Sequence, residues 1–326
     1  MSESLLRGAP LEPAPLHEEI ARGPAGGRAF WLRAEDGVRI RAALWPVAPA
    51  AAAPRGTVFL FPGRTEYIEK YGPTAARLSA AGYACLTLDW RGQGLADRPL
   101  DDPFKGHVGR FSEFQTDVAA LYRLAEALDL PRPWGLLSHS MGGAIALRTL
   151  LGAHPFAAAA FSAPMWGIGL PRPLRAVARP LARLLHDSAL SRLYAPGTGP
   201  ETYVLAQPFA DNLLTTDPAV WAMLIEQVGA VPGLILSGPS LQWVAEGILE
   251  CADLATQPPP RLPVYIGLGA EERIVEPAAV RAQAARWREA RLEIFPGAQH
   301  ELMMEGGATR TGFLDAALAL FEAMPR

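Results

Sequence analysis

The segment SHSMG, residues 138–142, places Ser140 two positions from the small residues Ser138 and Gly142, at the spacing of a catalytic nucleophile. A serine hydroxyl is a weak nucleophile at neutral pH, so it needs a base to take its proton and a carboxylate to orient that base. It also needs exposure, which a sharp strand-to-helix turn provides when the residues around it are small. Ser140 follows the apolar run 134–138 and precedes a helix-like segment that contains Gly142. The pattern and its context predict Ser140 as a nucleophile.

The usual form of this pattern is Gly-x-Ser-x-Gly, and Ser138 stands at its first glycine. Serine adds only a hydroxymethyl group, whose hydroxyl can hydrogen-bond to the nearby backbone. We therefore expect the turn to tolerate the change. The alternative interpretation is a chance Ser-x-Gly at the start of a helix.

In folds with such a turn, an acid and then a histidine follow the serine along the chain. His300 lies after the last strand-like run, 290–295, where the base belongs. His139 is adjacent to Ser140, and neighbours in a tight turn point apart. The other histidines fit the position less well: His17, His107, His154 and His186. We predict His300 as the base.

The acid has two candidates, because Glu271 and Glu272 both follow the strand-like run 262–270. Aspartate is commoner in this role, and a glutamate, with its longer side chain, needs a slightly withdrawn backbone. The residues alone leave both carboxylates open.

A tetrahedral intermediate needs two backbone N–H groups to bind its negative oxygen. Met141 follows the nucleophile at the start of a helix, where the helix dipole favours negative charge. We expect the second N–H from the loop after 57–61, in which Gly63 lets the backbone approach the substrate closely. Arg64 is the predicted donor, and its side chain suits either an anionic head group or a surface ion pair.

These residues need a scaffold, and the sequence predicts one in which strands and helices alternate. A hairpin around Glu35-Asp36-Gly37 precedes strand-like runs at 57–61, 83–89, 134–138, 156–164, 262–270 and 290–295. Helix-like segments lie between and after them at 72–82, 112–130, 141–153, 277–289 and 307–324, with Ser112 as an expected cap. This alternation predicts an α/β fold, with a mostly parallel eight-stranded sheet and helices on both faces.

The alternation stops in one long stretch. Residues 165–256 contain many prolines, several helix-like segments and no clear strand. We therefore predict a core of residues 28–164 and 257–326, interrupted by a helical insertion at 165–256. Residues 1–27, rich in Pro, Gly and Ala, are expected to form an extension that lies loosely on the surface.

The composition fits a globular enzyme of ordinary character. Half of the 326 residues are hydrophobic and 19% are charged, so a sizeable core is expected. The formal net charge of -3 argues against nucleic-acid binding. Cys85 and Cys251 form no disulfide framework, and no Cys/His cluster has zinc spacing, so we predict neither a metal nor an organic cofactor.

The beginning of the sequence, MSESLLRGAPLEPAPLHEE, has no apolar core of a secretory signal. The sequence also lacks a run of about 18 apolar residues that would cross a membrane. We therefore expect a cytoplasmic protein. Its oligomeric state is not predicted.

Four segments together resemble the α/β-hydrolase superfamily and, within it, the bacterial lysophospholipase and monoglyceride lipase group of serine hydrolases. The segment at 61–118, FPGRTEYIEKYG through FSEFQTDV, resembles the bacterial lysophospholipase branch and contains Pro-Gly-Arg-x-Glu, where monoglyceride lipases carry His-Gly-x-Gly-Glu. SHSMGGAIAL resembles the nucleophile turn of the group, and FPGAQHELMME resembles its histidine loop. GLGAEERIVEP is similar to a Gly-x-x-Asp-x-Ile-Val pattern, with Glu272 at the position of the aspartate.

The resemblance implies roles for individual residues. Ser140 is then the nucleophile, Glu272 the acid and His300 the base, with the N–H groups of Arg64 and Met141 as the oxyanion hole. Glu66 is implied to hold the oxyanion loop, and the DWRGQG turn, which contains Asp89, Arg91 and Gly92, is implied to be structural.

The resemblance also implies a lipid ester with one acyl chain as substrate, foremost a lysophospholipid, and a helical insertion that acts as a lid over the site. A monoacylglycerol lipase and a general carboxylesterase are the alternatives within the same chemistry. A catalytically silent binding protein of the same fold is the alternative from another class.

The insertion contains an amphipathic segment, LPRPLRAVARPLARLLHD. On a helix its arginines lie within roughly 80° of one another and its aliphatic residues lie opposite. The arginines are Arg172, Arg175, Arg179 and Arg183, and the aliphatic residues are Leu174, Val177, Leu181, Leu184 and Leu185. The arginines suit peripheral contact with an anionic membrane surface at the inner face of the membrane. Alternatively, the leucines pack on the core and the arginines are solvated. Pro180 predicts a kink or a split in this helix.

Overall fold

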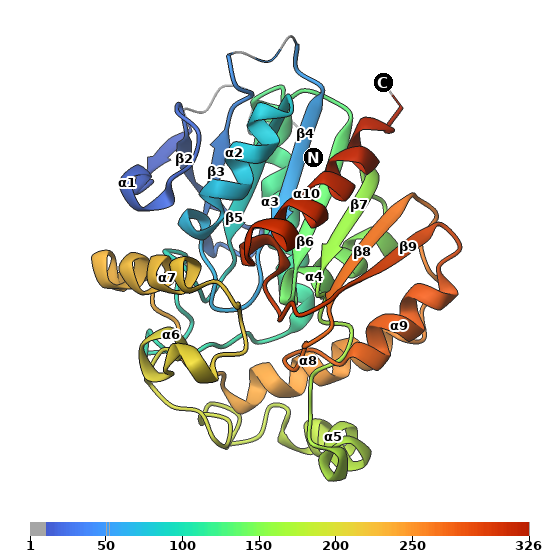
Figure 1. Ribbon diagram of the computed structural model, residues 1–326. Helices are drawn as coiled ribbons and strands as arrows, with labels where there is room; N and C mark the ends of the chain where they lie inside the picture. Colours follow the sequence, from blue (N-terminus) through green and yellow to red (C-terminus); the bar gives the residue numbers. More distant parts are fainter. Residues whose placement is uncertain (1–10, 50, 52, 326) are drawn as a thin grey trace.

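The computed structural model describes residues 11–49, 51 and 53–325. Its strands are β1 (Glu12–Ala14), β2 (Arg28–Arg33), β3 (Arg39–Trp45), β4 (Gly56–Phe61), β5 (Tyr83–Asp89), β6 (Trp134–His139), β7 (Phe156–Ser162), β8 (Val264–Gly269) and β9 (Ala290–Phe295). They form one open sheet in the order β1-β2-β3-β5-β4-β6-β7-β8-β9 (Figure 1). From β5 to β9 the neighbours in this order pair in parallel, whereas β1, β2 and β3 join the sheet antiparallel. The predicted α/β class and mostly parallel sheet are confirmed.

The predicted number of eight strands is wrong, because the N-terminal extension contributes a ninth. Glu12–Ala14 pairs with β2 at the edge of the sheet. A short helix, α1 (Glu18–Ala21), follows and buries Ile20 and Ala21. The extension is therefore not loose over these residues. Its strand carries Pro13 and shows no alternation of apolar residues, so the sequence pattern could not reveal it.

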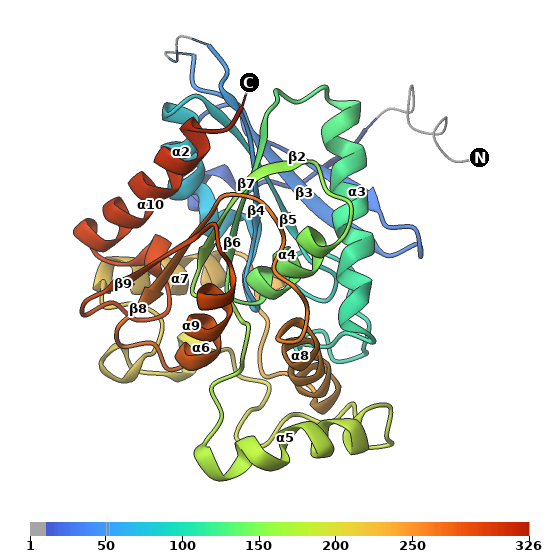
Figure 2. The same cartoon turned by 90° about the vertical axis from the view of Figure 1, so that its right-hand side faces the viewer.

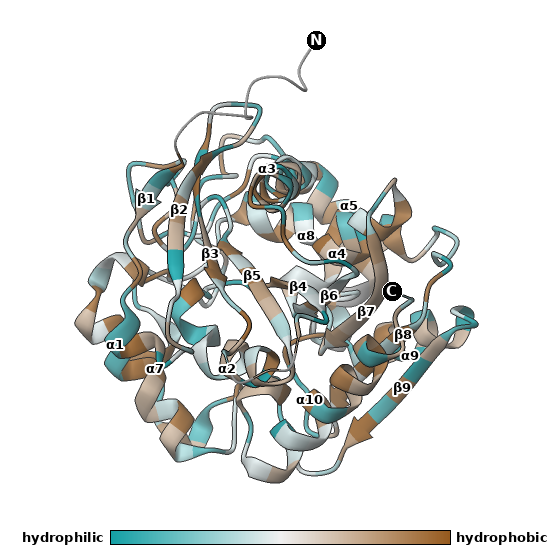
Figure 3. Ribbon diagram, turned by 90° about the horizontal axis from the view of Figure 1, so that it is seen from above, coloured by the Kyte–Doolittle hydropathy of each residue, from teal (hydrophilic) through white to brown (hydrophobic). Residues whose placement is uncertain are grey.

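Helices cover both faces of the sheet. Figure 2 shows α2 (Gly72–Ala80) and α10 (Gly307–Glu322) on one side, and α3 (Phe114–Ala127) and α4 (Met141–Leu151) on the other. α9 (Pro277–Arg286) shares the hydrophobic core of α3 and α4. Every residue of β4, β5, β6 and β8 is buried, as expected for strands covered on both faces. Hydrophilic residues on the edge strand β9 stand out in teal in Figure 3.

Single-turn helices lie both in the connections of the core and in the insertion. They are η1 (Ile68–Tyr71), η2 (Phe111–Glu113), η3 (Phe209–Asp211), η4 (Pro232–Leu234) and η5 (Leu302–Met304). The expected cap at Ser112 is wrong, because Ser112 lies inside η2 and α3 begins only at Phe114. The carboxylate of Glu113 accepts the N–H of Arg110 there, at 2.8 Å.

The insertion between β7 and β8 contains α5 (Arg172–Leu185), α6 (Tyr203–Ala206), α7 (Pro218–Ala230) and α8 (Leu241–Leu254). Within its described residues it has no strand of the sheet. It lies at the end of the sheet where α4 begins (Figure 1). The predicted split of α5 is wrong, because the helix continues through Pro180. No helix in the described part of the chain combines the length and apolar character needed to cross a bilayer.

Candidate active site

Ser140 lies at the predicted strand-to-helix turn. β6 ends at His139 and α4 begins at Met141, so Ser140 alone makes the turn. Its backbone has φ 49° and ψ -119°, a conformation that side-chain-bearing residues rarely adopt. Such backbone strain concentrates at functional sites and persists only where the surroundings enforce it.

Hydrogen bonds and close packing enforce this turn. The N–H of Ser140 donates to the carbonyl of Ser162 at 3.1 Å, and its own carbonyl accepts from Met165 at 2.8 Å. A Cβ on Gly142 would lie 2.2 Å from the carbonyl oxygen of Phe61, so only glycine fits between α4 and β4. Ser138 is fully buried, with its hydroxyl 3.5 Å from a carbonyl oxygen of β7, so the first position of the pattern has room for serine.

His300 and Glu272 meet at the ends of β9 and β8. His300 follows β9 and is 3% exposed, and its Nδ1 lies 2.6 Å from Oε2 of Glu272. The other carboxylate oxygen accepts the N–H groups of Ile274 at 2.6 Å and Val275 at 3.1 Å. Glu271 is exposed to solvent. Of the two candidate acids, the structure brings Glu272 to the histidine.

The charge state of Glu272 follows from these contacts. Burial by itself would raise the pKa of this carboxyl group. The neighbouring His300 and the two backbone N–H groups outweigh burial and hold the pKa below its ordinary value. Glu272 is therefore an anion at neutral pH, suited to orient and stabilise a charged imidazole.

One cavity of about 680 Å³ contains Ser140 and His300 in its wall, together with Arg64. Much of the remaining wall is apolar and comes from the insertion. This part includes Leu213, Leu214, Leu224, Val228, Leu234 and Leu236. Met141 begins α4, and the first N–H groups of a helix lack partners within it. The predicted nucleophile, base and oxyanion donors thus converge on one end of the sheet.

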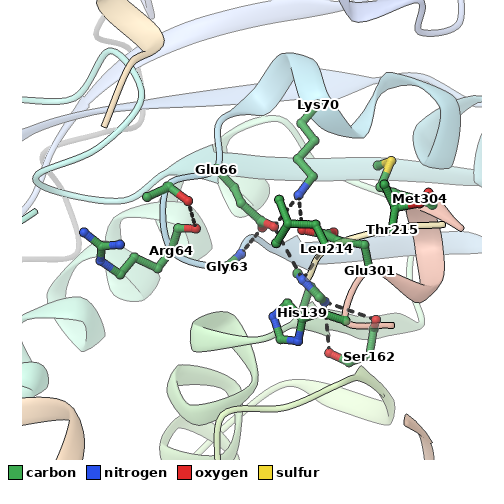
Figure 4. A network of polar contacts seen from close by, with 12 residues as sticks. Gly63, Arg64, Glu66, Lys70, His139, Ser162, Leu214, Thr215, Glu301 and Met304 are labelled. Atoms are coloured by element: carbon green, nitrogen blue, oxygen red, sulfur yellow. Dashed lines mark hydrogen bonds and ion pairs between the residues drawn. The ribbon is translucent and has the colours of Figure 1, made fainter. Parts of the chain in front are cut away.

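A buried ion-pair network lies beside the site (Figure 4). Nζ of Lys70 lies 2.6 Å from Oε1 of Glu66 and 2.6 Å from Oε1 of Glu301. The N–H of Gly63 donates to Glu66, so the network reaches the loop that holds Arg64. The other end of the network is Glu301, the residue directly after His300.

His139 closes the network from the side of the nucleophile. Its Nε2 lies 3.3 Å from Oε2 of Glu301, and its Nδ1 lies 3.1 Å from the carbonyl oxygen of Ser162. Sequence reasoning assigned Glu66 to the oxyanion loop but missed Lys70 and Glu301. The spacing of Glu66 and Lys70, four residues apart, was the available local signal.

The charges of the network stabilise one another. Burial lowers the pKa of His139, but Glu301 and Glu66 outweigh it and raise that pKa. Burial raises the pKa of Glu301, but Lys70 and His139 hold it well below its ordinary value. The pKa of Lys70 is raised as well, since its two carboxylates outweigh its burial.

Glu66, His139 and Glu301 also offer ligand atoms within 4.8 Å of one another, a spacing compatible with a metal ion. The ammonium group of Lys70, however, touches both carboxylates at 2.6 Å. The chain itself therefore supplies the positive charge at this point, and the residues fit an ion-pair network better than a metal centre.

Asp89 and Arg91 lie away from the cavity wall. Asp89 is fully buried, 2.7 Å from Nε of Arg41, and accepts the N–H of Ile68 at 2.9 Å. Arg91 pairs with Asp117 at 2.8 Å. These contacts support the structural role that the resemblance implied for the turn after β5.

An open, mostly parallel sheet with a serine at a strand-to-helix turn defines the class of α/β-hydrolases. Residues 52–307 match the family described as "Serine aminopeptidase, S33", and the chain belongs to this family.

Two curated relatives support the assignment. The chain is 33% identical over 277 residues to lysophospholipase L2 of Escherichia coli (strain K12), covering 81% of this chain and 79% of the relative. It is 29% identical over 266 residues to the probable lysophospholipase L2 of Haemophilus influenzae, covering 81% and 82%.

Solved structures show the same fold. A soluble variant of the monoglyceride lipase of Saccharomyces cerevisiae, in complex with a substrate analogue, superposes with a TM-score of 0.70 at 21% identity. The match covers 89% of this chain and 93% of that one. The monoacylglycerol lipase of Paleococcus ferrophilus matches with a TM-score of 0.65 at 20% identity, covering 86% and 98%.

Proposed function

We propose that the protein is a serine hydrolase that cleaves the carboxylic ester of a single-chain lipid, foremost a lysophospholipid. Its lysophospholipase relatives support a carboxylic ester hydrolase, and the monoglyceride lipases share its fold. One observation carries the proposal. Ser140, in a strained turn, lines the same cavity as His300, which pairs with Glu272 at 2.6 Å.

In the proposed mechanism, Oγ of Ser140 attacks the ester carbonyl while His300 takes its proton. Glu272 holds Nδ1 of His300, which leaves Nε2 to face the serine, and stabilises the imidazolium that forms. The N–H groups of Met141 and Arg64 bind the oxyanion. The glycerol oxygen leaves with the proton from His300, and water then releases the fatty acid from Ser140 by the same steps in reverse.

The insertion at 165–256 serves as the lid in this proposal. It supplies the apolar wall that includes Leu213, Leu224 and Leu236. A cavity of about 680 Å³ with such a wall suits an acyl chain, since burial of apolar surface drives binding. The lid would thereby set which ester reaches Ser140.

Labelling with a fluorophosphonate probe tests the enzyme. We expect a covalent adduct on Ser140 in the folded protein and none in Ser140→Ala. A folded wild-type protein that resists the probe would favour a catalytically silent binding protein. Hydrolysis of lysophosphatidylcholine, lysophosphatidylethanolamine and monoolein then separates the lysophospholipase from a monoacylglycerol lipase, and turnover of short soluble esters alone would indicate a general carboxylesterase.

We further propose that α5 contacts an anionic membrane surface from the cytoplasm. The aliphatic side of this helix faces solvent instead of packing on the core. Its exposed residues are Leu174 (47%), Val177 (49%), Leu181 (45%) and Leu184 (74%). These four residues do not pack on the core, contrary to the alternative interpretation, whereas Leu185 is half-buried.

The rest of α5 agrees with a surface-bound helix. It packs through Ala182, which is 2% exposed, while Arg179 and Arg183 are exposed. The side chains of Arg172 and Arg175 lie outside the part of the chain that the structure describes. The helix thus exposes apolar and basic side chains on either side of the buried Ala182. Such a combination suits binding to an anionic lipid surface. The two free cysteines, Cys85 and Cys251, are compatible with the reducing cytoplasm.

A further inference from the structure

Arg64 holds a positive charge in the cavity wall without a counter-ion. It lines the cavity with Ser140, and no carboxylate among the described residues lies within ion-pair distance of it. Lys70, the other lysine or arginine in this wall, is occupied by Glu66 and Glu301. Figure 4 shows the side chain of Arg64 directed away from that network.

The guanidinium is fixed in place, but some of its N–H groups have no hydrogen-bond acceptor. Nη2 donates to the carbonyl of Ser237 at 2.5 Å, and Cζ lies 5.0 Å from the ring centre of Trp243. Nε is buried without a hydrogen-bond partner. Nη1 has no hydrogen-bond partner among the described residues either. Gly106 leaves the space for this group, because a Cβ there would lie 2.4 Å from Nη2.

Such a group is costly to the free protein. Burial lowers the pKa of Arg64 to about 10, so it remains charged at neutral pH while its hydration is reduced. Buried donors without acceptors carry a penalty that a bound anion can relieve. Glu66 and Glu301 in the same wall pair with Lys70 and His139, and Glu201 is exposed to solvent.

We infer that the guanidinium of Arg64 is the binding site for the phosphate group of a glycerophosphate-based lipid, which deepens and rests on the proposed lipid esterase function. A planar guanidinium matches two phosphate oxygens at once, and its contact with Trp243 holds the plane in advance.

The position of Arg64 fits the size of such a substrate. Its backbone N–H is the proposed oxyanion donor, and its side chain extends from that point along the wall. In a lysophospholipid only the glycerol unit separates the ester from the phosphate. One residue can thus hold the ester carbonyl by its main chain and the phosphate by its side chain. A monoacylglycerol has no phosphate and gains nothing from this contact.

Two substrates with the same acyl chain test the inference, since their acyl contacts cancel. We expect Arg64→Gln to lower kcat/KM for lysophosphatidylcholine by about 10- to 100-fold, the loss of a charge-assisted hydrogen bond. The matched monoacylglycerol should lose less, because the substitution keeps the backbone N–H, so the readout is the ratio of the kcat/KM values for the two substrates. Arg64→Lys should restore part of the loss. An equal loss on both substrates, or no loss on either, overturns the phosphate site.

A second measurement separates this inference from the proposed function. Glycerophosphocholine should inhibit hydrolysis of p-nitrophenyl butyrate by the wild-type protein competitively, and Arg64→Gln should abolish the inhibition. Wild-type protein that cleaves only the short ester yet is inhibited contradicts the lipid substrate but keeps the phosphate site. If the wild-type protein cleaves lysophospholipid but is not inhibited by glycerophosphocholine, and Arg64→Gln loses no selectivity, the lipid substrate is kept and the phosphate site is contradicted.

Two further variants keep the inference testable if Arg64→Gln does not fold. Gly106→Ala should displace the guanidinium and reproduce the selective loss with the charge retained. Arg123→Gln is the matched control, because Arg123 donates to the carbonyl of Arg33 at 3.2 Å and does not line the cavity. It should leave the ratio of the two substrates unchanged, and a shift in that ratio would contradict a specific role for Arg64.

Discussion

Oε2 of Glu272 lies 2.6 Å from Nδ1 of His300, whereas Glu271, the preceding residue, is exposed to solvent. We predict that Glu272→Gln lowers kcat on the order of 10³- to 10⁴-fold, because an amide can favour the wrong tautomer and cannot stabilise the imidazolium. Glu271→Gln is the matched control and should retain activity. Steady-state kinetics on a soluble ester, with thermal melts to verify folding, decide the assignment. Equal losses of kcat in Glu272→Gln and Glu271→Gln would contradict the assignment of Glu272 as the acid.

Gly142 separates the start of α4 from the end of β4. A Cβ at this position would lie 2.2 Å from the carbonyl oxygen of Phe61, so backbone must move. We expect Gly142→Ala to abolish labelling of Ser140 by the fluorophosphonate probe and to lower the melting temperature.

Gly229, near the end of α7, provides the comparison, since a Cβ there meets nothing within 4 Å. Gly229→Ala should stabilise the protein by about 0.5–1 kcal/mol, because alanine loses less backbone entropy in a helix. Unchanged labelling in Gly142→Ala would refute the packing argument.

The sequence predicted the positions of Ser140 and His300 because both follow strands with clear apolar runs. It could not choose between Glu271 and Glu272, since both follow β8 and only the folded loop turns one of them toward His300. The link between Lys70 and Glu301 spans 231 positions and leaves no local pattern.

Helix α5 shows a different limit of the sequence. Its periodicity predicts an amphipathic helix, and the helix is present at 172–185. Periodicity does not say which side of the helix packs on the protein, however, and the buried residue is the small Ala182 rather than one of the exposed leucines. Similarly, β1 forms because it pairs with β2, and the sequence of this proline-containing segment does not predict that pairing.

Lys70 forms ion pairs with two buried carboxylates, Glu66 and Glu301, each with an oxygen 2.6 Å from Nζ. We predict that Lys70→Met destabilises the fold by about 3–5 kcal/mol, because Glu66 and Glu301 would be left as uncompensated buried charges. Urea unfolding measures the free energy. Lys105→Met is the control, since Lys105 pairs with Asp102 at 3.8 Å in a more exposed setting and should cost at most about 1 kcal/mol. Equal costs would contradict the role of burial.

His139 should make stability depend on pH. Its raised pKa means that the folded state favours the charged imidazole, so its contribution is complete below the ordinary value of 6.5 and is lost as pH rises through the folded value. Glu301, with its lowered pKa, acts oppositely. Its contribution is present above 4.5 and is lost as pH falls through its folded value.

The groups that face His139 are Glu66, Lys70, Glu301 and His300, whose ring centre lies 4.7 Å away. We predict that the stability advantage of the wild type over His139→Gln shrinks as the pH rises above 6.5. Urea unfolding across this range measures the difference. A difference that stays constant with pH would show that the pKa of His139 is not raised in the folded protein.

The exposed stripe and the arginines of α5 should act differently in membrane binding. Leu181→Ser with Leu184→Ser should weaken binding to anionic vesicles at any salt concentration, because both residues are exposed and would insert apolar surface. Arg179→Gln with Arg183→Gln should weaken it by about 1 kcal/mol per charge, at low salt only, and should not affect uncharged vesicles. Ile225→Ser, on α7 and 37% exposed, is the control for loss of an exposed aliphatic residue elsewhere in the insertion. Vesicle co-sedimentation that is unchanged in both α5 variants, or reduced equally by Ile225→Ser, would return α5 to the status of a solvated surface helix.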